Sequence, residues 1–283
     1  MERKKIKKSF FSSSCVCITG ASSGIGKEIA RILIRDYNVT VIAVARNIDK
    51  LNETRKEFAR DFADNYNKYL PLALDVTHEG SAEKIKEFMI SNNLKIKLLI
   101  SNAGQMQKFE TFMKSGQELG ASTLKQLFHV NFTSNLNLAK EFLEEFKQRE
   151  EEMNGIVFIG SSASVVPIPG AGIYSASKSA LKSFVEVIQA ENTNKNTYIG
   201  LMMPGMTNTG LFASTGKDLP SWVKKLMTPA PKMAKKIVKH IVKRRKAKLI
   251  GGDAHLMNFC YKIAPRTFLK TFRKLLVAFK IVG

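Results

Sequence analysis

Three side chains that can move a proton lie within a short stretch of the sequence: Ser161, Tyr174 and Lys178. Tyr174 and Lys178 are four residues apart, so on a helix a phenol and an ammonium group lie on the same face. The pKa of a free phenol is about 10, too high for acid–base work at neutral pH, but a neighbouring ammonium group favours the phenolate. Ser161 can hold a carbonyl or carbinol oxygen beside that phenol. Because a Tyr–Lys pair alone is also typical of a solvated helix face, the interpretation depends on the elements that position it.

A glycine-rich segment near the start of the chain, residues 19–26, follows an apolar run and precedes a stretch that is apolar at helical spacing. This order predicts a strand, a turn and a helix. Gly20 and Gly24 let the backbone approach a diphosphate, and Gly26 lets the helix pack closely on the strand. The N–H groups at the helix start attract an anion. An ordinary glycine turn would have the same composition, but it would not explain how the next apolar run ends.

That next run, residues 39–45, ends in Ala45-Arg46, where a dinucleotide fold meets the adenosine ribose. An acid at this place would accept hydrogen bonds from a free 2′-hydroxyl. Ala45 removes that acid, and Arg46 offers a planar cation to a 2′-phosphate. The pair therefore favours NADP(H) over NAD(H).

Together these motifs resemble the short-chain dehydrogenase/reductase family, in its ordinary-length, single-domain branch. The resemblance covers residues 14 to about 210 and follows the family's order. The matching positions are the glycine motif at 19–26, Asp75-Val76, Asn102-Ala103-Gly104, Asn131, Ser161, Tyr174, Lys178 and Pro204-Gly205. Ser101 stands where the family more often has Asn, but the turn that follows it is kept.

The resemblance implies a catalytic role for Asn131, Ser161, Tyr174 and Lys178. Tyr174 is expected to be the general acid in ketone reduction and the general base in alcohol oxidation. Lys178 would bind the nicotinamide ribose and lower the pKa of the phenol, and Ser161 would orient the substrate oxygen. Asn131 would hold a water molecule that links Lys178 to solvent.

The resemblance also implies a set of cofactor contacts along the chain. Asp75 is expected to bind the adenine amino group, with the Val76 backbone beside it. The segment from Pro204 to Thr209 would wrap the nicotinamide end. The full expected cofactor set is Gly20, Ser22, Ser23, Gly24, Ile25, Gly26, Arg46, Asp75, Val76, Asn102, Ala103, Gly104, Tyr174, Lys178, Pro204, Gly205, Thr207 and Thr209.

Alternating apolar strands and amphipathic helices predict an α/β fold with a doubly wound parallel sheet, the Rossmann fold, in a single domain. The predicted strands are 14–19, 39–45, 69–74, 97–101, 155–161, 197–202 and 247–251. We expect a basic arm at 1–10, the main domain at 11–261 with a substrate lid at about 205–231, and a basic amphipathic helix at 262–283. Cys15 and Cys17 have the spacing of core residues on one strand face, and with a distant Cys260 they indicate a reducing compartment. The four histidines are scattered, and no metal site is expected.

The formal net charge of +21 is concentrated at the two ends of the chain. From residue 222 onward, seventeen lysines and arginines stand against one acid, Asp253. In the tail, six apolar residues fall on one helical stripe among cations: Phe268, Leu269, Phe272, Leu275, Leu276 and Phe279. Such a stripe can lie on an anionic membrane surface, or it can pack on the protein body or on a second subunit.

No apolar run approaches the roughly 20 residues that a spanning helix needs, and the basic N-terminal segment lacks the apolar stretch of a signal peptide. We therefore expect a cytoplasmic protein, peripheral on the inner face of a membrane if the tail binds lipid. A homo-oligomer is expected by analogy with the family, and no nucleic acid is expected as a partner.

Seven apolar residues after the Pro-Gly motif can line a substrate cleft or pack on the core: Leu211, Phe212, Leu219, Trp222, Val223, Leu226 and Met227. If they line the cleft, the substrate is lipophilic, such as a steroid, a retinoid or a long-chain keto compound. The tail after Lys248 also looks like that of lipid-directed family members of the hydroxysteroid and retinol type. The hypothesis is an NADP(H)-dependent oxidoreductase for a hydrophobic carbonyl or alcohol. One alternative is a ketoacyl reductase whose basic face docks an acyl carrier protein. The other is a non-catalytic nucleotide-sensing or nucleic-acid-binding protein.

Overall fold

Seven strands form one parallel sheet in a computed structural model that describes residues 15–111, 121–149, 151–213 and 221–282. The order across the sheet is β3-β2-β1-β4-β5-β6-β9, so the winding direction reverses between β1 and β4. The strands are β1 (Cys15–Thr19), β2 (Thr40–Ala45), β3 (Tyr69–Ala73), β4 (Ile96–Ser101), β5 (Asn154–Ile159), β6 (Thr197–Pro204) and β9 (Ala247–Ile250). Each predicted strand agrees with an observed one to within two residues at either end. The doubly wound, Rossmann-type single domain is therefore confirmed.

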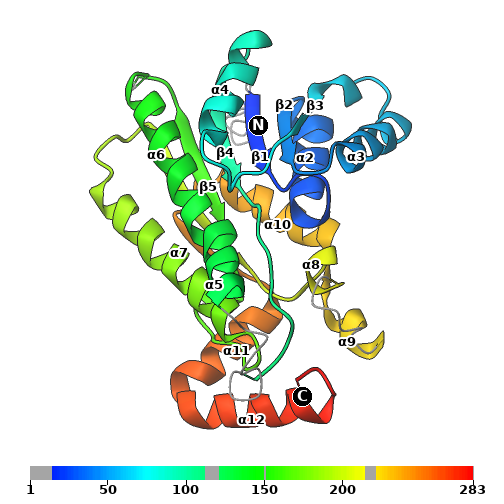
Figure 1. The fold of residues 1–283 in the computed structure, drawn as a ribbon, viewed down its shortest axis with the longest axis vertical. Helices are drawn as coiled ribbons and strands as arrows, with labels where there is room; N and C mark the ends of the chain where they lie inside the picture. The colour runs from blue at the N-terminus through cyan, green and yellow to red at the C-terminus, as the bar shows by residue number, and fades with distance from the viewer. Residues whose placement is uncertain (1–14, 112–120, 150, 214–220, 283) are drawn as a thin grey trace, which may run out of the picture.

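Helices cover both faces of this sheet, as Figure 1 shows. One layer contains α2 (Gly24–Tyr37), α3 (Ile48–Asp61) and α10 (Ala230–Val242), and the other contains α4 (Ser81–Ser91), α5 (Ala121–Phe128), α6 (Ser134–Lys147) and α7 (Gly172–Glu191). Alternation along β1 connects the two cores, because Val16 and Ile18 belong to the first while Cys15 and Cys17 belong to the second. Both cysteines are buried free thiols.

Short elements join the sheet to the loops at the carboxyl ends of the strands. The π-helical turn η2 (His129–Thr133) lies between α5 and α6, and the 3-10 turn η3 (Ser162–Ser164) follows β5. A second, two-stranded sheet contains β7 (Thr207–Asn208) and β8 (Thr228–Pro229). Between these strands, the chain forms α8 (Gly210–Ala213) and α9 (Ser221–Leu226). The lid predicted at about 205–231 spans these elements, and its residues 214–220 lie outside the described chain.

The C-terminal segment contains two helices where one was predicted. Helix α11 (Gly252–Ile263) and helix α12 (Pro265–Ala278) pack against each other at the end of the molecule opposite α4 (Figure 1). They break at Ala264, because a residue before proline is disfavoured in helical geometry. The predicted basic arm, residues 1–10, lies outside the described residues. No helix in the described ranges is long and apolar enough to cross a bilayer.

Candidate functional site

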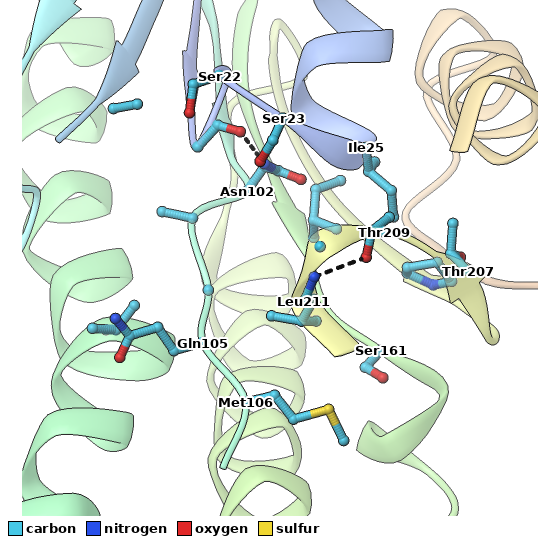
Figure 2. A pocket seen from close by; sticks show the side chains of 18 of the residues that line it. Ser22, Ser23, Ile25, Asn102, Gln105, Met106, Ser161, Thr207, Thr209 and Leu211 are labelled. Carbon is cyan, nitrogen blue, oxygen red and sulfur yellow. Dashed lines mark hydrogen bonds between the residues drawn. The ribbon is translucent and has the colours of Figure 1, made fainter. Parts of the chain in front are cut away.

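A pocket of about 620 Å³ opens at the carboxyl ends of the strands, where the winding direction of the sheet reverses. Open α/β sheets bind their ligands at this place. Figure 2 shows its extent: Ser22 and Ser23 lie at one end, Met106 and Ser161 at the other, with Thr207 and Thr209 along one side. The volume is large enough for an extended ligand with several contact groups.

The glycine turn has the geometry that the sequence predicted. Gly20 and Gly24 have φ angles of 68° and 56°, in the left-handed region that favours glycine. A Cβ atom on Gly26 would lie 2.5 Å from the Gly20 carbonyl oxygen and equally close to Asn102 Nδ2. No side chain fits there without a backbone shift. Gly26 thus allows the start of α2 to approach the turn closely.

Asn102 and Thr19 tie this turn to the end of β4. Asn102 Nδ2 donates to the Thr19 carbonyl oxygen at 2.9 Å. Thr19 Oγ1 in turn accepts hydrogen bonds from the backbone N–H groups of Asn102 and Ala103, both at 2.9 Å. These bonds fix the two loops that face each other across the switch point. Asn102 therefore has a structural role in shaping the pocket wall.

The part of the pocket next to the glycine turn also carries two cations and one carboxylate. Arg46 and Lys50 both line the pocket, together with Asp75. Burial raises the pKa of Asp75, but hydrogen bonds from the Thr77 backbone N–H and hydroxyl outweigh it, so the net pKa is lowered. The Asp75 carboxylate is therefore charged at neutral pH, and the two hydrogen bonds from Thr77 hold its Oδ1 atom in place. Lys50 was not predicted; it lies in the first turn of α3, which begins two residues after Arg46.

Tyr174 lies in the first turn of α7, and its side chain is buried. The Gln107 carboxamide oxygen accepts a hydrogen bond from the Tyr174 backbone N–H at 2.9 Å, which satisfies one unpaired donor of the helix start. Burial raises the pKa of the Tyr174 phenol, and a hydrogen bond with the Ser161 side chain partly offsets this. The phenol in this structure is therefore the protonated form at neutral pH. Burial outweighs this hydrogen bond, so the pKa of the phenol is above its ordinary value.

Ser161 is held as the first residue of a capping box. Its hydroxyl accepts a hydrogen bond from the Ala163 N–H at 3.1 Å, while the Ser164 hydroxyl accepts one from the Ser161 N–H at 3.3 Å. Ser162 also lines the pocket. The hydrogen bond to Tyr174 distinguishes Ser161 from Ser162.

Lys178 is buried one turn after Tyr174 and donates to the Ile159 carbonyl oxygen at 3.2 Å. Burial lowers the pKa of this ammonium group to about 8. A Cβ on Gly104 would come within 3.4 Å of Lys178 Nζ and 3.2 Å of Asn131 Oδ1, so the three residues are neighbours.

Asn131 lies in the π-helical turn η2 and is fully buried. Its side chain accepts from the Gln105 N–H at 2.9 Å and donates to the Gln105 carbonyl oxygen at 2.9 Å and to Ser177 Oγ at 3.1 Å. These bonds tie η2 to the loop after β4 and to α7. A π-helical turn widens the backbone and is frequent at functional sites.

The segment after β6 is anchored by an acid that sequence reasoning did not assign. Asp253 Oδ2 accepts a hydrogen bond from the Met206 backbone N–H at 2.7 Å. A Cβ on Gly205 would lie 2.5 Å from that carboxylate, so glycine is required beside it. Gly205 N–H also donates to the Ile250 carbonyl oxygen at 2.7 Å. The loop that contains Thr207 is thereby fastened to the start of α11.

An apolar cluster surrounds the end of the pocket that contains Tyr174. It combines Tyr174 with residues from four parts of the chain: Met106 and Phe109 after β4, Ala163 and Ala171 after β5, Val223 and Met227 after β6, and Leu276, Ile281 and Val282 of the C-terminal segment. A Cβ on Gly170 would lie 2.5 Å from a Val282 methyl group, so the last residues pack tightly here. Leu211 lines the pocket and Leu226 is exposed, whereas Leu219 and the side chains of Phe212 and Trp222 lie outside the described residues.

Most of the predicted site residues line this one pocket. Gly24, Gly26 and Asn131 do not line it. Each of them instead lies against residues that do line the pocket. Sequence reasoning missed other residues that line or support it: Lys50, Gln105, Met106, Gln107, Ile168 and Asp253. In the described ranges, no cluster of three metal-ligating side chains occurs.

A parallel sheet with a glycine turn and a pocket at its switch point defines a Rossmann-type dinucleotide-binding fold. The chain belongs to the short chain dehydrogenase family of oxidoreductases, whose sequence model matches residues 14–220. It is 28% identical over 251 residues to the 3-ketodihydrosphingosine reductase of Bos taurus, covering 86% of this chain and 73% of the relative. It is 30% identical over 195 residues to a benzil reductase ((S)-benzoin forming) of Saccharomyces cerevisiae, with 69% and 72% covered.

Solved structures confirm the fold. A short-chain dehydrogenase from Sphingobium yanoikuyae in complex with NADPH superposes with a TM-score of 0.72 at 22% identity, covering 91% of this chain and 95% of that one.

Proposed function

We propose that this protein is an NADP(H)-dependent oxidoreductase that transfers hydride between nicotinamide and a carbonyl or secondary alcohol of a hydrophobic substrate. One observation carries the proposal: a buried phenol, Tyr174, is hydrogen-bonded to Ser161 at one end of a pocket whose other end is a glycine turn. A proton donor and an oxygen-binding hydroxyl thus share a site with a diphosphate cradle.

The residues at the glycine end fit a dinucleotide. The positive φ angles at Gly20 and Gly24 bring backbone close to the pocket, and the start of α2 offers N–H groups to a diphosphate. Arg46 and Lys50 line the pocket where a 2′-phosphate would lie, and Ala45 stands where an acid would select a free 2′-hydroxyl. These cations favour NADP(H) over NAD(H).

The chain's own residues then supply the proton chemistry. When bound, the reduced nicotinamide supplies the hydride. Ser161 holds the substrate oxygen, and Tyr174 donates its phenolic proton to that oxygen as the alcohol forms. Lys178, with a pKa of about 8, is mainly cationic at neutral pH and stabilises the phenolate that remains. Oxidation of an alcohol uses the same groups in reverse, with the phenolate as the base.

The surroundings of Tyr174 favour an apolar substrate. Met106 and Ile168 line the catalytic end, and Val282 packs behind it. The name of the Bos taurus relative, 3-ketodihydrosphingosine reductase, denotes reduction of a ketone, and from its similarity we infer a ketone on a long apolar chain. The carbonyl would lie at Ser161 and Tyr174, and the apolar chain would leave along the cluster.

A substrate screen tests this proposal. Purified protein is incubated with NADPH or NADH and with long-chain 3-keto compounds, steroids, retinoids, short ketones and carrier-bound ketoacyl groups, while the absorbance of the reduced nicotinamide is followed. We expect turnover with NADPH and an increase in kcat/KM as the apolar part of a ketone grows. Turnover confined to carrier-bound substrates would instead indicate the ketoacyl reductase alternative. Absence of turnover together with tight NADPH binding would indicate a nucleotide sensor.

A further inference from the structure

The exposed face of α11 has the composition of a membrane-binding surface. Leu256, Phe259 and Ile263 are 64%, 63% and 68% exposed. Their spacing places all three on one stripe of the helix, and Ala254, which is buried against the body, lies on the opposite face. The stripe therefore points away from the protein. Three large apolar side chains side by side in water differ from the single exposed residues that ordinary surfaces carry.

The stripe predicted on α12 is placed differently. Leu276 is buried in the apolar cluster around Tyr174, and Phe272 packs on the same cluster. Phe268 is half-buried between Tyr261 of α11, at a ring-centroid distance of 6.2 Å, and Phe272, at 5.5 Å. Phe268, Phe272 and Leu276 hold α12 to α11 and to the body, which was one of the two alternatives raised by the sequence. Leu275 and Phe279 of the same stripe are exposed. On the two C-terminal helices, the most exposed apolar side chains are nevertheless those of α11.

Exposed cations follow this surface along the two helices, and acids are absent from the sequence after Asp253. Six exposed lysines and arginines lie on the two helices and the residues next to them: Lys262, Arg266, Lys270, Arg273, Lys274 and Lys280. None of them takes part in the ion pairs of the described residues. An apolar stripe with unneutralised cations matches the acyl boundary and the anionic headgroups of a bilayer.

We propose that α11 and α12 together bind an anionic membrane surface, with Leu256, Phe259 and Ile263 inserted at the acyl boundary and the six cations near lipid phosphates. A second copy of this chain would bury the same apolar stripe, but it would bring an equal set of cations against this one. Charge complementarity therefore favours the lipid. Membrane binding is measurable whether or not the proposed reaction is correct.

The test is sedimentation of the full chain with vesicles of phosphatidylcholine containing about 30% phosphatidylserine, compared with pure phosphatidylcholine. We expect binding to the anionic vesicles that weakens as salt is added. A Leu256→Ser, Phe259→Ser, Ile263→Ser variant should lose at least about tenfold in vesicle affinity. A Lys262→Gln, Arg266→Gln, Lys270→Gln variant should lose about fivefold for each cation removed.

A matched control removes the same number of exposed apolar side chains elsewhere: Ile90→Ser, Leu124→Ser and Val187→Ser. It should bind vesicles like the unaltered chain, and circular dichroism should show that all variants are folded. Unchanged vesicle binding in the stripe variant would overturn the proposal. A second outcome would also overturn it: the unaltered protein does not sediment with vesicles but forms a dimer without lipid, and the stripe variant is a monomer.

Discussion

Asp253 connects the C-terminal helices to the loop that we assign to the nicotinamide end, and its removal is a sharp test of that assignment. Its carboxylate accepts the Met206 N–H at 2.7 Å, and Gly205 leaves no room for another side chain beside it. Asp253→Ala leaves this donor without its charged acceptor. A hydrogen bond to a charged group contributes about 1.5–3 kcal/mol, and every 1.4 kcal/mol is tenfold. We therefore expect a loss of about 10- to 150-fold in kcat/KM.

The assay is steady-state kinetics with NADPH, together with thermal unfolding of the same samples. Asp253→Asn keeps an oxygen acceptor but removes the charge, so it should retain more activity than Asp253→Ala. If both variants keep kcat/KM within twofold of the unaltered protein while the melting temperature falls, the carboxylate only stabilises the fold. That result would refute the positioning role.

Three further predictions concern the cofactor and the proton donor. Arg46→Asp should raise the KM for NADPH by about 10- to 100-fold and shift preference toward NADH, because it replaces a phosphate-binding cation by an acid; an unchanged preference in parallel titrations would assign the phosphate to Lys50. Gly26→Ala should weaken nucleotide binding and lower stability by about 1–3 kcal/mol, because its Cβ would meet backbone at 2.5 Å; unfolding in urea with and without NADPH measures both. For ketone reduction, kcat/KM should fall as pH rises through about 8, where the buried Lys178 loses its proton, and a profile that stays flat to pH 10 would contradict this.

The elements that repeat a local pattern were predictable from the sequence. Period-two alternation located Cys15 and Cys17 on one face of β1, and the glycine spacing located the turn at Gly20 and Gly24. These features depend on neighbouring residues, so a single sequence contains them. The seven-stranded sheet follows from the same kind of signal.

Other parts of the site depend on contacts between distant segments. Gln107 reaches Tyr174 across 67 positions, and Asp253 reaches Met206 across 47. No periodicity connects such pairs, so neither was predicted. The stripe on α12 illustrates the same limit. Its amphipathic pattern is evident in the sequence, but only the packing shows that Leu276 faces the pocket cluster and that the most exposed apolar side chains of the two helices are on α11.

The central claim is that Tyr174 is the proton donor, and Tyr174→Phe tests it most directly. The substitution removes only the phenolic hydroxyl, and the buried ring keeps its packing. The measurement pairs turnover of the best ketone with NADPH affinity, the latter followed by fluorescence of the nicotinamide. We expect turnover to fall at least about a hundredfold, in the range that a general acid contributes, while NADPH affinity changes by less than about threefold. If Tyr174→Phe is folded, binds NADPH and still turns over close to the rate of the unaltered protein, the assignment is contradicted.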